Sequence, residues 1–487
     1  MKSPFSRIIN FSCLWALMTV GMTLGMTGAV TWAAGPFVPP GAGDKAKLLL
    51  DDASAAEARL LLVGQAKEEV NVAYFILHED DSGLITLAEL RDAARRGAKV
   101  RLLLDGSTHR VGKGMMTHLL KNGVEIKMYH PLITNPMHRE EKPGDWVIKV
   151  PGTKIELKQS AVEPYNENSF EHPFSWEWRR MHDKQIIVDG NRGLLGSRNI
   201  KNGYFTDKRY QGFRSYDVDV YVEGQSPRRA NQYFMELWRS SEVELPPDLS
   251  KVTQVMEDEA AGRLNHFKTV VDRWKVQGAT KDRIANALDD LVDVDAAKFV
   301  HDPFDMKGIW AGMELDLLEM IRDAKEEIII ENPYILLTHD FRVEFEAAIY
   351  RGVRITVLTN SPETMDIAIV GNQYKRERHE LVEMGMKVYE KTGHGMLHGK
   401  VLIVDRKKIA VTTYNMDPRS HDLNLEIGMI FDSPALVQTY MPRMEHFLAE
   451  AVPYLGERFE DPKPANFKER CMQLLRKIGR GLIRHQL

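Results

Sequence analysis

Two copies of one sequence pattern run through most of this chain. In the first copy Arg96–Leu104 reads RGAKVRLLL, and in the second Arg351–Leu358 reads RGVRITVL. Two further pairs of segments match in the same order, Ala66–Tyr74 with Ala324–Ile330 and Asn122–Ile126 with Met384–Val388. In each copy short apolar runs alternate with segments of helical pattern, which is typical of βαβ units and parallel strands. The repeat therefore predicts an α/β fold of two related domains, residues 45–240 and 301–456, each a mostly parallel mixed sheet flanked by helices.

The composition excludes several classes of protein. The 487 residues are 43% hydrophobic and 28% charged, as in globular proteins, which excludes a disordered, collagenous or disulfide-scaffold chain. The two cysteines, Cys13 and Cys471, are too few for a cysteine zinc cluster and allow one disulfide at most. A net charge of −4 disfavours a protein that coats nucleic acid through its total charge.

Residues 1–34 predict an export signal. Lys2 and Arg7 are the only charged residues here, and an apolar stretch follows them that ends in small residues at Ala33–Ala34. The stretch is also long enough to span a bilayer, so a cleaved signal peptide and a retained membrane anchor are both open. In either case we expect the rest of the chain to be exported, at the periplasmic side of a bacterial inner membrane or in the periplasm.

Each copy ends on the same constellation of polar residues. The first has His182, Lys184 and Asp189, then Ser197 and Asn199; the second has His398, Lys400 and Asp405, then Thr413 and Asn415. The spacing is the same in both copies, and the apolar residues between Lys and Asp predict a strand. Side chains two apart on a strand share a face, so a hairpin would present histidine, lysine, hydroxyl and amide together. One such match is typical of ordinary polar residues at a strand end, but two within a duplicated domain indicate a functional site.

This set of side chains suits phosphoryl transfer without a metal. Two imidazoles beside one centre can act as nucleophile and general acid, and a covalent phosphohistidine would divide the transfer into two steps. Two lysines, two hydroxyls and two asparagines can bind the non-bridging oxygens of one phosphate. The set contains no cluster of acids suited to caging a metal, so we expect neither a metal nor another cofactor. The second acceptor could be water or an alcohol, and the residues leave that choice open.

The paired motifs resemble the phospholipase D superfamily, and the resemblance covers most of residues 45–456. Several stretches are similar in particular to the C-type bacterial cardiolipin synthases: Tyr74–Asp105, Arg180–His182, Gly196–Ile200 with Gly203–Phe205, Glu331–Tyr334, Asn415–Ser420 and Leu423–Glu426. The resemblance implies that two phospholipase D-like domains pack face to face about a pseudo-twofold axis, with one active site at the seam.

The resemblance also implies a role for each motif residue. His182 would be the nucleophile, while His398 would protonate the leaving group and then deprotonate the acceptor. Phosphate binding would fall to Lys184, Lys400, Asn199 and Asn415, helped by Ser197 and Thr413. An acid beyond each motif would orient a histidine, and we favour Glu426 with His182 and Asp217 with His398. Asp189 and Asp405 complete the catalytic motif and are expected to be mainly structural, fixing the hairpin and the lysine.

Two features depart from the repeat. The second copy has Thr412–Thr413 where the first has Gly196–Ser197, which keeps a hydroxyl and is expected to narrow the pocket. The first copy also carries an insert, residues 131–179, whose aromatic residues are Trp146, Tyr165, Phe170, Phe174, Trp176 and Trp178. The insert is either a surface excursion packed on its own aromatics or a lid or wall for acyl chains, since aromatic rings suit the membrane interface.

Two more segments lie outside the repeat. Residues 241–300 show no strand run and predict a helical linker. Residues 465–487 place apolar side chains at helical spacing with basic ones between them, and Glu469 is the only acid. They predict a basic amphipathic helix that lies on an anionic membrane surface. Gly479 and Gly481 weaken this helix, and a helix docked on the domain is the alternative.

The expected function is phosphatidyl transfer in phospholipid biosynthesis, with cardiolipin as the product. The resemblance implies phospholipid substrates, phosphatidylglycerol first and phosphatidylethanolamine as a second candidate, and no obligate protein partner is evident. The alternatives are an exported phospholipase D or nuclease with water as acceptor, and an inactive lipid-binding protein. The completeness of both motifs disfavours the inactive protein, and no basic run beside the motifs supports nucleic acid as a partner.

Overall fold

The computed structural model describes residues 43–130, 146–149, 156–159, 179–206, 212–246, 248–276, 278–304 and 312–459. These residues belong to one unit that spans Ala42–Leu487. The segment 1–34 predicted to direct export, the tail 465–487 predicted to be a basic helix and most of the aromatic insert lie outside the described residues. Of the insert, two strands are described, β5 (Trp146–Lys149) and β6 (Glu156–Gln159), which pair with each other in antiparallel orientation. In this described part of the chain, no helix is both long and apolar enough to cross a membrane.

The first half of the chain builds a nine-stranded sheet in the order β12-β4-β3-β2-β8-β9-β11-β1-β13. Its strands are β1 (Lys45–Leu49), β2 (Glu69–Tyr74), β3 (Lys99–Asp105), β4 (Val124–Tyr129), β8 (Lys184–Val188), β9 (Arg192–Gly196), β11 (Asp219–Glu223), β12 (Val243–Glu244) and β13 (Val292–Asp293). The second half builds an eight-stranded sheet in the order β14-β22-β20-β19-β15-β16-β17-β23. Its strands are β14 (Ala296–His301), β15 (Glu327–Glu331), β16 (Arg354–Asn360), β17 (Lys387–Lys391), β19 (Val401–Val404), β20 (Lys408–Thr412), β22 (Ile427–Asp432) and β23 (Val452–Tyr454).

The duplicated α/β fold is confirmed, but parallel pairing is confined to one region of each sheet. Strands β2, β3 and β4 are parallel, as are β15, β16 and β17, and the other neighbours in both sheets are antiparallel. Parallel neighbours need a crossover, which α2 (Asp81–Arg95) supplies between β2 and β3 and α3 (Lys113–Lys121) between β3 and β4. The motif strands β8–β9 and β19–β20 are instead joined by tight turns and must run antiparallel.

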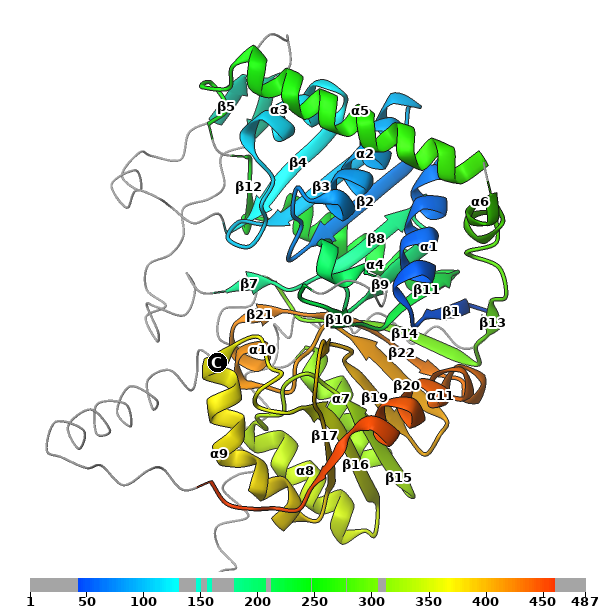
Figure 1. Cartoon of the computed structure of the whole chain (residues 1–487), viewed down its shortest axis with the longest axis vertical. Coiled ribbons are helices and arrows are strands. Elements are labelled where there is room, and N and C mark those ends of the chain that lie inside the picture. Colours follow the sequence, from blue (N-terminus) through cyan, green and yellow to red (C-terminus); the bar gives the residue numbers. More distant parts are fainter. Residues whose placement is uncertain are drawn as a thin grey trace, which may run out of the picture. The chain divides into compact units, whose positions relative to one another are not determined.

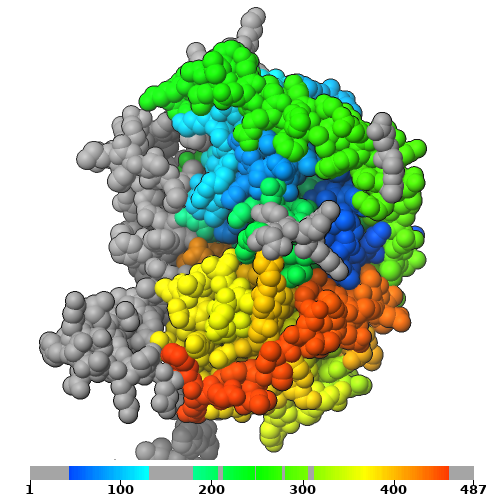
Figure 2. All heavy atoms as spheres, viewed as in Figure 1, coloured from blue at the N-terminus to red at the C-terminus, as the bar shows by residue number. Residues whose placement is uncertain are grey.

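Each sheet is covered by helices on its outer face and by a shared core on its inner face (Figure 1). The outer helices of the first sheet are α1 (Asp52–Gly64), α2, α3 and α5 (Gln254–Val276); those of the second are α7 (Met313–Asp323), α8 (His339–Tyr350) and α9 (Ala368–Met384). Helices α4 (Gln225–Arg239) and α11 (Pro434–Glu450) contribute to a single apolar cluster that also holds inner-face residues of both sheets. Figure 2 shows the surfaces of the first half, in blue to green, and of the second half, in yellow to red, in contact with each other on one face of the molecule.

The segment 241–300 differs from the predicted linker. It is largely helical, but α5 packs along α2 and α3, and its Ala260 and Leu264 are buried in the core of the first sheet. It also contains three strands, of which β12 and β13 extend the first sheet and β14 starts the second at Ala296. Two of these strands have only two residues and β14 begins with Ala-Ala-Lys, so none carries the apolar alternation by which a strand is recognised.

Candidate active site

Two short parallel ladders tie the halves together and place each motif histidine. In one, β7 (Arg180–Met181) pairs with β21 (Asn424–Leu425); in the other, β18 (Met396–Leu397) pairs with β10 (Ser215–Tyr216). The backbone N–H of His182 then donates to the carbonyl of Leu425 at 2.9 Å, and that of His398 donates to Tyr216 at 2.8 Å. Each ladder therefore sets a histidine of one half beside an acid of the other, because Glu426 follows β21 and Asp217 follows β10.

Both histidines are buried and bonded to a carboxylate through Nδ1. His182 Nδ1 lies 2.8 Å from Glu426 Oε2, and His398 Nδ1 lies 2.7 Å from Asp217 Oδ1. The histidines are 5% and 7% exposed and the two acids are 0% exposed. This is the pairing favoured from the resemblance. In the described part of the chain neither Nε2 takes part in a hydrogen bond. Each ring is therefore oriented through Nδ1, and its Nε2 is available to react with a substrate or to transfer a proton.

Aromatic edges complete the setting of the two rings. Phe75 meets His182 edge to face at a centroid distance of 4.7 Å, and Tyr204 meets His398 in the same way at 5.6 Å. These edge contacts restrict rotation of each imidazole ring, in addition to the contact between its Nδ1 and a carboxylate.

The hydroxyls predicted to bind phosphate are engaged with the orienting acids. Ser197 Oγ donates to Asp217 Oδ1 at 2.8 Å and accepts the Val218 N–H at 3.0 Å. Thr413 Oγ1 donates to Glu426 and accepts the Ile427 N–H at 2.9 Å. Both hydroxyls therefore donate to the orienting acids in this structure, and their binding of phosphate remains a prediction.

The two lysines are buried cations at the site. Lys184 Nζ donates to the carbonyl of His182 at 2.5 Å, and Lys400 Nζ donates to that of His398 at 2.7 Å. Burial lowers the pKa of Lys184 to about 7 and that of Lys400 to about 8. The charge of Lys400 also lowers the pKa of Lys184, and both ammonium groups lower the pKa of His182. A bound phosphodiester anion would offset this repulsion and keep both lysines charged.

The two asparagines differ in how free they are. Asn199 Oδ1 accepts the Ile76 N–H at 3.2 Å, and its Nδ2 donates to the Tyr204 hydroxyl at 3.1 Å. Asn415 Oδ1 is buried and has no hydrogen-bond partner among the described residues. Asn415 therefore has an unused acceptor, which suits a hydroxyl or N–H group of a ligand rather than a phosphate oxygen.

The motif aspartates Asp189 and Asp405 lie away from the chemistry. Asp189 accepts the backbone N–H groups of residues 67–69, and Asp405 accepts those of residues 325–327, at the starts of β2 and β15. Both have left-handed backbone conformations, with φ of 51° and 52°. No hydrogen bond or ion pair in the described residues joins either to a motif lysine. They fix the hairpin, as expected, and the described residues show no contact through which they would also fix the lysines.

The Thr412–Thr413 departure has a packing cause. Gly196 faces Asp219 across β9 and β11, and a Cβ on Gly196 would lie 2.6 Å from the Asp219 Cα. In the second half Thr412 faces Gly428, where a Cβ would lie 2.7 Å from Thr412 Cγ2. The glycine of the facing pair lies on β9 in the first half and on β22 in the second, so Gly428 leaves the space that the Thr412 side chain occupies. The expected narrowing of the pocket remains a prediction.

The two histidine–acid pairs differ in electrostatics. Burial raises the pKa of Glu426 to about 7, against the charge of Lys184 and the bond from Thr413. Burial would also raise the pKa of Asp217, but His398, Arg198 and Lys400 outweigh it and lower that pKa well below its ordinary value. Burial holds the pKa of His182 well below its ordinary value and lowers that of His398, where Asp217 acts in the opposite direction. The His398–Asp217 pair is thus the better suited to hold a proton as imidazolium and carboxylate.

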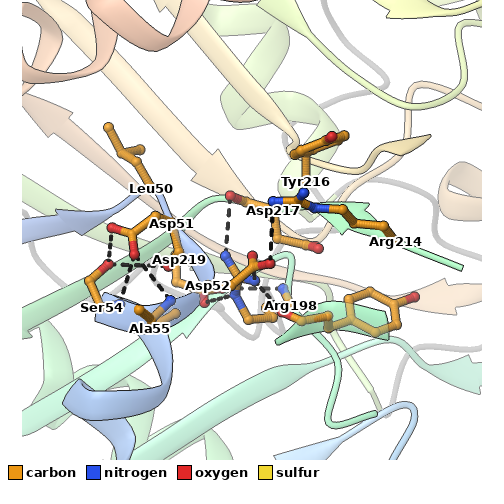
Figure 3. Close-up of polar contacts among 12 residues, drawn as sticks. Leu50, Asp51, Asp52, Ser54, Ala55, Arg198, Arg214, Tyr216, Asp217 and Asp219 are labelled. Atoms are coloured by element: carbon orange, nitrogen blue, oxygen red, sulfur yellow. Dashed lines mark hydrogen bonds and ion pairs between the residues drawn. The ribbon is translucent and has the colours of Figure 1, made fainter. Parts of the chain in front are cut away.

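Arg198 is a member of the site to which the sequence analysis gave no role. It is 0% exposed and lies between Ser197 and Asn199, within an ion-pair cluster that includes Asp52 and Asp219 (Figure 3). In the sequence, Arg198 stands out as a charged residue directly after the apolar and small residues that end β9.

Comparisons with known proteins agree with this geometry. The family model described as cardiolipin synthase, PLD-like domain, matches residues 61–140 and 317–448, one segment in each half. Cardiolipin synthase C of Escherichia coli K12 is 27% identical over 414 residues, which cover 79% of this chain and 80% of that protein. An uncharacterized protein of Helicobacter pylori is 24% identical over 427 residues, covering 81% of this chain and 77% of its own. The solved phosphatidylserine synthase of Haemophilus influenzae Rd KW20 has the same fold, with a TM-score of 0.61 at 14% identity over 91% of this chain and 95% of that one.

Proposed function

This chain belongs to the phospholipase D superfamily, and from that premise we propose that it is a phosphatidyltransferase that makes cardiolipin through a covalent phosphohistidine. The observation that carries the proposal is the pair of buried histidines, each held at Nδ1 by an acid from the other half and each without a hydrogen bond at Nε2 among the described residues. Two such groups on either side of one phosphate provide an attacking and a leaving-group partner in the same site.

In the first step His182 Nε2 attacks the phosphorus of a phosphatidylglycerol. The new P–N bond forms as the P–O bond to the glycerol headgroup breaks, and His398 Nε2 gives its proton to the departing oxygen. The low pKa of His182 keeps its imidazole neutral and nucleophilic, while the ionised Asp217 stabilises the imidazolium of His398. Lys184 and Lys400 supply positive charge for the non-bridging oxygens, and the side-chain amides of Asn199 and Asn415 are further donors to them.

In the second step the neutral His398 removes the proton of a hydroxyl on a second phosphatidylglycerol. The resulting oxygen attacks phosphorus, the P–N bond to His182 breaks, and cardiolipin is released. The balance of both steps is two phosphatidylglycerol molecules converted to one cardiolipin and one glycerol. Phosphatidylethanolamine as donor would release ethanolamine by the same route.

Water as the acceptor would instead give phosphatidic acid. The first step is common to both outcomes, so the site residues favour neither. Transfer to a lipid alcohol is favoured here because several relatives that align over most of this chain bear the name cardiolipin synthase. The predicted export segment 1–34 and the predicted basic helix 465–487 support a location at the periplasmic surface of the inner membrane. There the enzyme would meet its phospholipid substrates in the membrane.

Expression in a bacterium that lacks its own cardiolipin synthases, followed by lipid extraction, tests the proposal. We expect cardiolipin with the wild-type chain and none with His182→Ala or His398→Ala. His446→Ala is the matched control, because His446 lies on α11 with a side chain 63% exposed. Release of phosphatidic acid without cardiolipin by purified wild-type protein on phosphatidylglycerol vesicles would show a hydrolase instead.

Trapping with phosphatidylglycerol labelled at phosphorus tests the covalent step. We expect label bound to the protein in rapidly quenched wild-type enzyme and none in His182→Ala. Label retained on His182→Ala would overturn the assignment of the nucleophile.

A further inference from the structure

Arg198 lies beside Asp217, the acid that orients His398. Its Nε donates to Asp219 Oδ2 at 3.0 Å and its Nη1 donates to Asp52 Oδ1 at 2.7 Å and to the carbonyl of Tyr204. Figure 3 shows the guanidinium beside Asp217, whose backbone carbonyl accepts Arg198 Nη2 at 3.5 Å. Burial disfavours this cation, but Asp219, Asp217 and Asp52 outweigh the penalty and raise its pKa further. Arg198 is therefore a permanent charge next to Asp217.

The Arg198 cluster is held from several elements, which makes its geometry rigid. Asp52 comes from the first turn of α1, and Asp219 opens β11. Arg59 of α1 donates to the same Asp219 Oδ2 at 3.0 Å. The carboxylate of Asp219 fits only because Gly196 leaves the space for it across the ladder.

The second half lacks this arrangement at the matching positions. Tyr414 replaces Arg198 between Thr413 and Asn415, and its hydroxyl donates to Glu314. Gly428 replaces Asp219 opposite Thr412. The two histidine–acid pairs share a hydroxyl that donates to the acid and a lysine two residues after the histidine, although Glu426 also accepts the Asn424 side-chain amide. One arginine and its acid are thus an asymmetry built into a duplicated site.

We propose that Arg198 is a positioning residue that holds Asp217 ionised and in place, and so makes His398 the histidine that carries the proton to the leaving group. The inference rests on the proposed function, in which His182 attacks and His398 protonates. Its consequence is specific to the leaving group. Without Arg198, His398 would be a poor acid, so departure of a glycerol oxygen would be slow. A p-nitrophenol oxygen would still depart, because it takes the electrons of the P–O bond as a stable phenolate and needs no proton.

Single-turnover kinetics with two substrates test this inference. Release of glycerol from phosphatidylglycerol and of p-nitrophenol from phosphatidyl-p-nitrophenol both report the first step alone. For Arg198→Met we expect glycerol release to fall about 10²-fold, the loss typical of a displaced catalytic group, with p-nitrophenol release nearly unchanged. Arg198→Lys keeps the charge and should restore part of the glycerol rate. Arg59→Met is the matched control: it removes a buried guanidinium from the same Asp219 without touching Asp217, and both rates should respond alike.

A second variant covers failure of Arg198→Met to fold. Arg198→Met combined with Asp52→Asn removes both ends of the 2.7 Å pair and leaves less unpaired buried charge. It should show the same leaving-group dependence. Equal losses on both substrates in the Arg198 variants, or the same dependence in Arg59→Met, would overturn the inference while the wild-type enzyme still made cardiolipin. Wild-type protein inactive on both substrates would overturn the proposed function itself.

Discussion

Replacing Asp189 should lower the stability of the folded protein and leave its turnover unchanged, although this residue belongs to the repeated His–Lys–Asp motif. Its Oδ1 accepts the N–H groups of Lys67, Glu68 and Glu69 at 3.1, 2.8 and 3.2 Å, and its Oδ2 pairs with Arg192 at 2.8 Å. The carboxylate thus joins the turn after β8 to the start of β2. Asp189 lies at the opposite end of β8 from His182. Asp189→Ala and Asp189→Asn remove these contacts to different extents.

The magnitude follows from the contacts. Asp189→Ala loses the acceptor of three partly exposed hydrogen bonds, worth about 2 kcal/mol together. Alanine at a φ of 51° adds about 1 kcal/mol, since a Cβ without a local polar partner disfavours the left-handed region. Asp189→Asn keeps an oxygen for the three N–H groups and tolerates that φ, so it should lose about 1 kcal/mol or less, mainly the Arg192 pair.

The assay is thermal or denaturant unfolding together with turnover per folded molecule. We expect Asp189→Ala to unfold at a lower temperature than Asp189→Asn, and both to keep wild-type turnover; Asp405→Ala should behave like Asp189→Ala. The bonds from the three N–H groups lower the pKa of Asp189 although burial alone would raise it. Its stabilisation is therefore present above the ordinary value of 3.8 and is lost as the pH falls through the lower folded value, so wild type and Asp189→Ala should converge in acid.

Asp217→Asn is the matched control, because it replaces the acid that does touch a histidine. It should lose about 10⁴-fold in turnover, as for the acid of a histidine–acid pair, while remaining folded. The reasoning is refuted if Asp189→Ala abolishes turnover with no change in unfolding.

Three further predictions concern the site. Glu426→Gln should slow both formation and breakdown of the covalent intermediate by about 10³- to 10⁴-fold in quench-flow, because His182 loses its carboxylate in both steps; an effect on only one step would contradict this. The pH profile of kcat/KM should peak near neutrality. It should fall in acid as Glu426, with a pKa of about 7, gains a proton. It should fall in alkali as Lys184 and then Lys400, with pKa values of about 7 and about 8, lose theirs. The alkaline limb of kcat should lie higher, since bound phosphate stabilises both ammonium groups, and a flat profile would refute these roles. Thr413→Val removes a hydrogen bond to the ionised Glu426 and should move the acid limb to higher pH, with about tenfold lower activity on that limb; an unmoved limb would show that the bond does not matter.

Much of the fold could be predicted because its signals are local. The repeat identified two α/β units and the antiparallel hairpins β8–β9 and β19–β20. His182, Ser197 and Asn199 lie just outside these strands, so the two-residue period does not decide which way their side chains point. The same local reasoning failed for β12, β13 and β14, whose short or weakly apolar sequences become strands only because a sheet edge is available to pair with them. It also gave no sign that Ser197 and Thr413 donate to Asp217 and Glu426, because these acids are not neighbours of the hydroxyls along the strand.

The sequence by itself determined the duplicated unit, the hairpin that carries each motif and the chemical types gathered there. Only the tertiary structure decided which acid holds which histidine, because Glu426 is 244 positions from His182 and Asp217 is 181 positions from His398. It also decided that Asp189 and Asp405 close turns and that Arg198 lies beside Asp217. The physical reason is that strand alternation follows from the covalent geometry of neighbouring residues. Contacts across the seam instead depend on how two sheets pack through a shared core and two short ladders.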